Sequence, residues 1–204
     1  MKSRKSGNRH PLLLYRRVMS RLWAAALILG LLLLVIWGWG WFFTTPLLED
    51  GDNIWLAVAG LVSVAFALFA FFGRSMAYVQ PNRDHLRLVT PFLRMNISYR
   101  RLRNSHPAVF TQLFPPNQAS WAQRNLLSPF YGKTAVVVEL TAYPMNPGLM
   151  RFFLAPQMFS PRSKGLVILV PDWMAFSTEL DSFRGAWMQS QKGAPHTPAP
   201  AHKP

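Results

Sequence analysis

Cysteine is absent from this 204-residue chain, and acidic residues are few. Without a thiol there can be no disulfide, no thiolate metal site and no cysteine nucleophile. Eight Asp and Glu stand against 22 Lys and Arg, which gives a formal net charge of +14. In a soluble protein this balance suggests a nucleic-acid partner, whereas in a membrane protein it suggests a fixed orientation and contact with anionic lipid. The choice between the two depends on the hydrophobic segments.

Charged residues are missing from two long stretches of the chain. Residues 22–43 (LWAAALILGLLLLVIWGWGWFF) and residues 53–72 (NIWLAVAGLVSVAFALFAFF) contain none. A helix of about 20 apolar residues crosses the hydrocarbon core of a bilayer, so each stretch predicts a transmembrane helix. The first stretch exceeds the roughly 7–15 residues of a signal-peptide core and lacks a small-residue cleavage site, which disfavours a cleaved leader.

The charges that flank the two spans differ in sign. Residues 1–21 carry seven basic residues and no acid, the connector 44–52 carries three acids and no base, and the residues after the second span are again rich in arginine. Because basic flanks stay on the cytoplasmic side, we expect a multi-pass protein of the cell membrane with both ends in the cytoplasm and the connector outside. An outer aromatic belt would be formed by Trp37, Trp39, Trp41 and Trp55.

The chain is therefore predicted to have four parts. A basic cytoplasmic arm (1–21) precedes a transmembrane hairpin (22–73), a cytoplasmic domain (74–192) and a disordered tail (193–204) that is rich in proline and alanine. Within the domain, strand periodicity and β-branched content predict strands, which are residues 86–89, 93–99, 134–142, 151–154 and 165–170. Residues 107–128 look helical or irregular.

A helix is predicted near the end of the domain, over residues 171–191. Its apolar residues recur at spacings of three and four and so lie on one helical face; they are Trp173, Phe176, Leu180, Phe183 and Trp187. Asp172 is placed to cap the first turn. An aromatic stripe at this spacing is typical of a helix that packs on a core.

Two spans followed by "YVQPNRDHLRLVTPFLRMNISYRRLRN", and a closing helix introduced by "LVPDW", resemble bacterial membrane proteins with a pleckstrin-homology-like (PH-like) domain. The resemblance covers roughly residues 76–190 and rests on patterns of hydrophobicity and charge. It implies an α+β membrane protein, in which the two-helix hairpin is followed by a bent β-barrel or sandwich capped by a C-terminal helix. It also implies a binding or scaffolding module without catalytic residues.

Sequence motifs that carry chemistry are missing as well. The five histidines show no metal-ligand spacing, and neither a Gly-rich phosphate loop nor a G-x-S-x-G nucleophile turn occurs. Glu139, inside the apolar run 134–142, is expected to face outward or to pair with an arginine. We therefore expect no enzyme, no metal and no cofactor.

Arginines cluster close to the two spans in the sequence. The candidates for contact with lipid headgroups or with a partner are Arg16, Arg17, Arg21, Arg74, Arg87, Arg94, Arg100, Arg101 and Arg103. Each base near an anionic leaflet contributes about 1 kcal/mol, and the effect fades within about 8 Å. The same charge could also be a solvated strand face or a protein-docking surface. Nucleic acid is disfavoured, because aromatic side chains do not alternate with the basic ones.

Two functions are compatible with these features. The first is a membrane-anchored, non-enzymatic PH-like module that binds lipid headgroups or scaffolds proteins at the cytoplasmic face, with homo-oligomers possible. The second is an accessory subunit or assembly factor of a larger membrane complex. There the hairpin would contact its partners through Gly30, Ala57 and Gly60, because small residues let helices approach closely.

The orientation can be tested with single cysteines in this cysteine-free chain. We expect Thr45→Cys to react with a membrane-impermeant maleimide in intact cells and Ser190→Cys to react only after permeabilisation. Labelling of position 190 in intact cells would contradict the predicted orientation.

Overall fold

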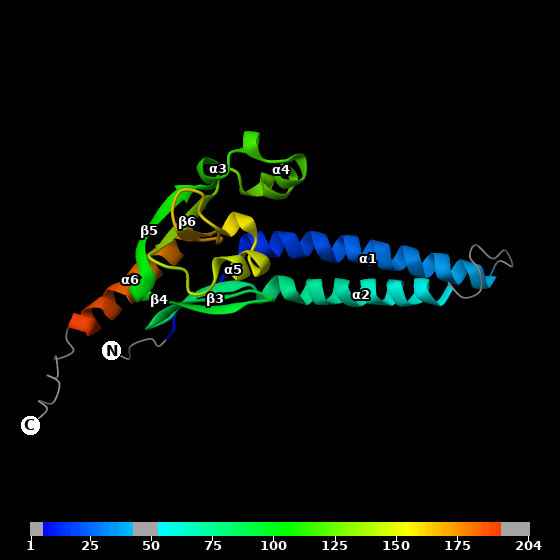
Figure 1. The fold of residues 1–204 in the computed structure, drawn as a ribbon, viewed down its shortest axis with the longest axis horizontal. Coiled ribbons are helices and arrows are strands. Elements are labelled where there is room, and N and C mark those ends of the chain that lie inside the picture. Colours follow the sequence, from blue (N-terminus) through cyan, green and yellow to red (C-terminus); the bar gives the residue numbers. More distant parts are fainter. Residues whose placement is uncertain (1–5, 43–52, 193–204) are drawn as a thin grey trace, which may run out of the picture.

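A long helical hairpin extends from one side of a domain that contains two sheets (Figure 1). The structure, a computed structural model, describes residues 6–42 and 53–192. Helix α1 spans Leu13–Phe42 and helix α2 spans Asn53–Met76. Both are long and apolar enough to cross a membrane, and most of their large apolar side chains are exposed rather than packed into a core. The predicted outer connector 44–52 and the predicted tail 193–204 lie outside the described residues.

The two helices of the hairpin approach each other closely at a pair of glycines. A Cβ added at Gly30 would lie 3.0 Å from the carbonyl oxygen of Gly60 and 2.8 Å from Cγ2 of Val64. A Cβ added at Gly60 would meet the side chain of Leu34 at 2.8 Å. Both glycines thus lie in the contact between α1 and α2, where small residues commonly let two apolar helices approach closely.

The domain contains two antiparallel meanders, of four and three strands. The first has the order β1-β2-β3-β4, with strands His10–Pro11, Tyr78–Pro81, His85–Val89 and Arg94–Ser98. The second has the order β5-β6-β7, with strands Leu102–Val109, Thr134–Leu140 and Gly165–Ile168. The remaining helices of the domain are α3 (Phe110–Leu113), α4 (Trp121–Leu127), α5 (Pro147–Phe153) and α6 (Trp173–Lys192).

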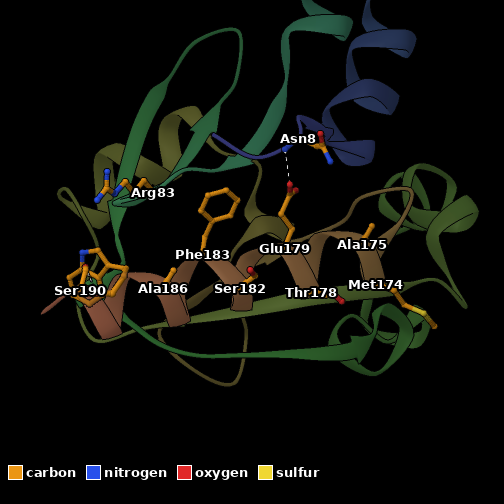
Figure 2. Close-up of a pocket in the computed structure, with 11 residues that line it drawn as sticks. Asn8, Arg83, Met174, Ala175, Thr178, Glu179, Ser182, Phe183, Ala186 and Ser190 are labelled. Carbon is orange, nitrogen blue, oxygen red and sulfur yellow. Dashed lines mark hydrogen bonds between the residues drawn. The ribbon is translucent and has the colours of Figure 1, made fainter. Parts of the chain in front are cut away.

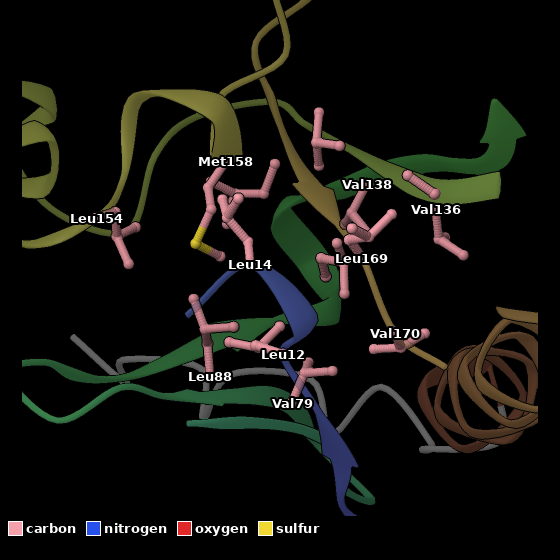
Figure 3. Close-up of a cluster of buried hydrophobic side chains, with 14 of the residues drawn as sticks. Leu12, Leu14, Val79, Leu88, Val136, Val138, Leu154, Met158, Leu169 and Val170 are labelled. Carbon is pink, nitrogen blue, oxygen red and sulfur yellow. The ribbon is translucent and has the colours of Figure 1, made fainter. Parts of the chain in front are cut away.

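The first strand comes from the segment that precedes the hairpin. His10 pairs with Val79, and Pro11 pairs with Tyr78. Directly afterwards Leu12 and Leu14 enter the core between the two sheets, where Figure 3 shows them among side chains of both sheets. The sequence predicts residues 1–21 as an arm; of these, residues 6–21 are part of the domain and of α1. Two paired residues are too few to produce a strand pattern, which is why the sequence does not reveal them.

Most of the predicted strands are present, and one is wrong. Met95, Ile97 and Tyr99 are buried while Arg94 and the other alternate residues of β4 are exposed, as the alternation predicts. Residues 151–154, predicted as a strand, belong mainly to helix α5. The Asn146 side chain caps that helix by accepting from Gly148 N at 2.9 Å, and a proline occupies its first turn.

Helix α6 confirms the predicted closing helix. Asp172 Oδ1 accepts a hydrogen bond from Ala175 N at 2.9 Å, which caps the first turn. Phe176 and Leu180 are fully buried, and the other three aromatic residues of the stripe pack at the edge of the core. The helix contacts β2 of one sheet and β5 and β6 of the other, so it closes one end of the space between them.

The buried face of α6 generates a stability prediction. Phe176→Ala removes a ring with no exposed surface and should lower the free energy of unfolding by about 3–5 kcal/mol. Met174→Ala is the control on the same helix, because that side chain is 61% exposed, and it should change stability by no more than about 0.5 kcal/mol. Chemical denaturation of the full chain in detergent micelles measures both. Equal effects would contradict the packing of α6.

A second prediction concerns the helix contact. Gly30→Val should force α1 and α2 apart, costing about 1–3 kcal/mol, because the added side chain meets backbone atoms of the facing helix. Gly38→Val is the matched control, since nothing lies within 4 Å of a Cβ added there. Disulfide formation between cysteines introduced at Leu34 and Gly60 reports the separation. Unchanged cross-linking in Gly30→Val would disprove the close contact.

Candidate functional site

The arginines that the sequence predicts as a basic site separate into groups at different distances from the apolar part of the hairpin. We call the place where the hairpin joins the domain, residues 15–21 of α1 and 73–76 of α2, the hairpin root. Five of the predicted residues lie at or beside it and are called the root arginines: Arg16, Arg17, Arg21, Arg74 and Arg94.

Local contacts fix two of these side chains. Arg21 donates from Nη2 to the backbone carbonyl of Asn125 at 2.8 Å and to its side-chain oxygen at 2.9 Å, which holds α4 against α1. The guanidinium of Arg74 lies over the ring of Phe71, 4.0 Å from its centroid. Arg16 and Arg17 are exposed on the second turn of α1. Arginines of both helices thus lie close to the end of the uncharged stretches.

The turn between β3 and β4 reaches beside the apolar part of α2. Thr90 closes this turn, with its N–H donating to the Leu93 carbonyl at 2.7 Å and its hydroxyl oxygen accepting from Leu93 N at 3.0 Å. Phe92, 49% exposed, lies against Phe69 with ring centroids 5.8 Å apart. Phe69 is seven residues before the end of α2, or about 10 Å along the helix axis. Arg94 follows Phe92 by two residues, so its backbone lies within about 7 Å of that level.

The remaining predicted arginines lie farther away. Along β3 and β4, Arg94 pairs with Val89 at the root end and Ser98 pairs with His85 at the other end. Four strand residues span about 13 Å, which exceeds the screening length of about 8 Å. The three arginines that follow Ser98 are beyond this point and are called the distal arginines: Arg100, Arg101 and Arg103. Arg87 lies between the two groups, opposite Asn96.

Tyr99 anchors the distal end of β4. Its hydroxyl donates to the Asn82 carbonyl at 2.7 Å, and burial raises the pKa of Tyr99 well above its ordinary value. The phenol therefore stays protonated and keeps its hydrogen bond. Arg101 is also held at this end, because it donates to the Tyr143 carbonyl at 3.1 Å.

A groove of about 460 Å³ opens on the sheet next to the end of α2. We call it the root groove, and its lining residues are Arg9, Pro11, Ser75, Met76, Tyr78, Val89 and Arg94. In the sequence, Arg9 is recognisable only as one of the basic residues before the first span. Its place in the groove depends on the pairing of β1 with β2, and the guanidinium lies over the Tyr78 ring, 4.8 Å from its centroid.

A groove of about 920 Å³ runs along α6 (Figure 2). Phe183 and Glu179 extend from the helix toward the N-terminal segment. Both carboxylate oxygens of Glu179 are engaged: Oε1 accepts from Asn8 N at 3.0 Å, and Oε2 contacts His10 Nε2 at 2.9 Å. Glu179 thus ties the N-terminal segment to α6, and this structural role accounts for both oxygens of its carboxylate.

Metal ligands do not gather in the described residues, where no three His, Asp or Glu side chains come close enough to hold an ion. Glu139, half-buried on β6, lines a separate groove together with Arg103, Arg162 and Lys164.

No family model, curated protein or solved structure matches this chain. The hairpin root and its charges are therefore the features of the molecule that bear on function.

Proposed function

We propose that this chain is a two-span integral membrane protein whose domain lies against the cytoplasmic leaflet and binds anionic lipid headgroups there without catalysing a reaction. The observation that carries the proposal is the hairpin root. Two helices with exposed apolar surfaces meet the domain at a place with five arginines, four on the helices and one on β4, and an exposed phenylalanine reaches beside the apolar part of α2.

Exposure of the apolar side chains supports insertion into a membrane. Ile28, Leu31 and Val35 of α1 are each more than half exposed, as are Leu61 and Val62 of α2. A core helix of a soluble protein would bury these side chains, because each is worth about 1.5–3 kcal/mol when removed from water. Lipid is the solvent that accepts them, and the backbone groups of a helix are satisfied internally.

The charges support the cytoplasmic orientation and contact with lipid. The root arginines flank the spans on one side only, as expected for the cytoplasmic face. Each adds about 1 kcal/mol of attraction to an anionic leaflet when it lies near the surface. Phe92 would enter the interfacial layer, where aromatic side chains are favoured. The distal arginines are too far from the root to take part in this contact.

The arrangement of the domain supports the PH-like part of the proposal. The predicted architecture is a bent barrel or sandwich capped by a C-terminal helix, and the observed meanders of four and three strands with α6 between them are compatible with it. In this proposal the hairpin is inserted between the first and second strands of the PH-like fold.

A second candidate is a scaffold or accessory subunit that holds another protein. The groove along α6 favours it, because it is large and bordered by the 61% exposed Met174 and by the half-buried Trp187. Contact through the predicted small residues of the hairpin is less favoured, because Gly30 and Gly60 already face each other. Purification in mild detergent followed by mass measurement would reveal a stoichiometric partner.

The lipid contact gives a test with a built-in control. In the full chain, the triple variant Arg16→Gln, Arg17→Gln, Arg74→Gln should lose up to about 3 kcal/mol of the extra stability that an anionic bilayer confers over a neutral one, at about 1 kcal/mol per base. Thermal unfolding in nanodiscs of phosphatidylcholine, with and without phosphatidylglycerol, measures this difference. Comparing the two bilayers cancels the loss of the Arg74–Phe71 contact.

The charge-matched control is the variant Arg100→Gln, Arg101→Gln, Arg103→Gln, which should keep the full lipid-dependent difference. Added salt should reduce the difference in the wild type, because screening shortens the reach of exposed charges. If the distal variant loses as much as the root variant, the domain does not lie on the leaflet as proposed.

A further inference from the structure

The root groove has a floor built by all four strands of the first sheet. Pro11 pairs with Tyr78, Tyr78 with Val89 and Val89 with Arg94, so these residues form one row across the sheet. Tyr78 follows the last residue of α2 by two positions. The row therefore lies directly next to the end of the hairpin, and its position is set by backbone pairing rather than by a loop.

Two guanidinium groups line the groove, one near each end of that row. Arg9 comes from the segment before β1 and is held over the ring of Tyr78. Arg94 comes from β4, the opposite edge of the sheet. Neither makes a hydrogen bond or an ion pair with the described residues, and no Asp or Glu is among the residues that line the groove. Two unpaired arginines without a carboxylate favour a phosphate, which a guanidinium binds through two parallel hydrogen bonds.

An apolar border faces the hairpin. Met76, at the end of α2, lines the groove and is 48% exposed, and Phe92, which is not one of the lining residues, lies two residues before Arg94 against Phe69. A soluble phosphate compound has no apolar chain to pack against such a border, whereas a phospholipid has acyl chains that can continue beside α2. The volume of about 460 Å³ lies within the roughly 300–1,000 Å³ that small-molecule pockets occupy.

We propose that the root groove binds the phosphate group of one anionic phospholipid between Arg9 and Arg94, with the acyl chains beside Met76 and Phe92. The inference rests on the proposed function and adds to it a discrete site with a stoichiometry of one. General attraction by the root arginines requires only charge near the leaflet, whereas this site requires a guanidinium at each of two particular positions.

The site can be tested by native mass spectrometry of the full chain in detergent with added phosphatidylglycerol or phosphatidylcholine. We expect the wild type to retain one phosphatidylglycerol and to retain phosphatidylcholine more weakly, because the choline cation offsets the charge of the phosphate and is repelled by the two arginines. The double variant Arg9→Gln, Arg94→Gln should weaken retention at least tenfold. The control Arg100→Gln, Arg103→Gln removes the same charge and should retain the lipid as the wild type does.

Further arms separate the site from its alternatives. Arg9→Lys, Arg94→Lys keeps the charge but loses the paired hydrogen bonds, so it should remain weaker than the wild type. Inorganic phosphate and glycerol phosphate, added to the lipid complex, should not displace the lipid; displacement by either would overturn the assignment to a phospholipid. Circular dichroism of each variant verifies that the fold is intact.

Two failures can be told apart. Equal loss of lipid in the Arg9/Arg94 variant and in the Arg100/Arg103 control would overturn the discrete site and leave the membrane module standing. Release of the chain from membranes by alkaline carbonate, without detergent, would instead refute the proposed membrane insertion, and the groove assignment with it.

Discussion

The pairing of β1 with β2 is the interaction on which the rest of the structure depends. It places one strand of the sheet before the hairpin and the next strand after it, so both ends of the hairpin belong to one fold. Leu12 N donates to the Ala77 carbonyl at 3.1 Å, and Leu13 N donates to the Leu169 carbonyl at 3.0 Å. Helix α1 therefore starts, and helix α2 ends, within the hydrogen-bonded domain, and within the described residues no flexible linker separates the domain from its helices.

Because the domain is attached to the hairpin at two points, its arginines are held at fixed distances from the helices. A domain on a single linker could present any of its arginines to a membrane, whereas a domain fixed at two points presents one face. The register of β3 and β4 then determines which arginines lie at the root and which lie at the distal end. Arg94 and Arg100 are close in sequence, yet the direction of β4 places them at opposite ends of the sheet. Charge density along the sequence therefore does not separate the root arginines from the distal arginines.

The elements that could be predicted from the sequence are those with long patterns of hydrophobic residues. Two uncharged runs of about 20 residues specify the helices, and five apolar residues at helical spacing specify α6. Short elements were not predicted. Strand β1 has two residues, which are too few to show a strand period. Helix α5 has only seven residues, and its signal is the cap at Asn146 rather than periodicity. The root groove could not be predicted, because it joins Arg9 to Arg94 through three pairings across four strands.

The early position of β1 has a consequence for biosynthesis. His10 contacts Glu179, which is 169 residues further along the chain, and pairs with Val79 only after both long helices have been made. Such non-local contacts are slow to form, because the intervening chain must be ordered first. In a membrane protein the hairpin would enter the bilayer during that interval. Strand β1 could then pair with β2 once residues 78–81 had been made, and the contact of His10 with Glu179 would follow once α6 had left the ribosome.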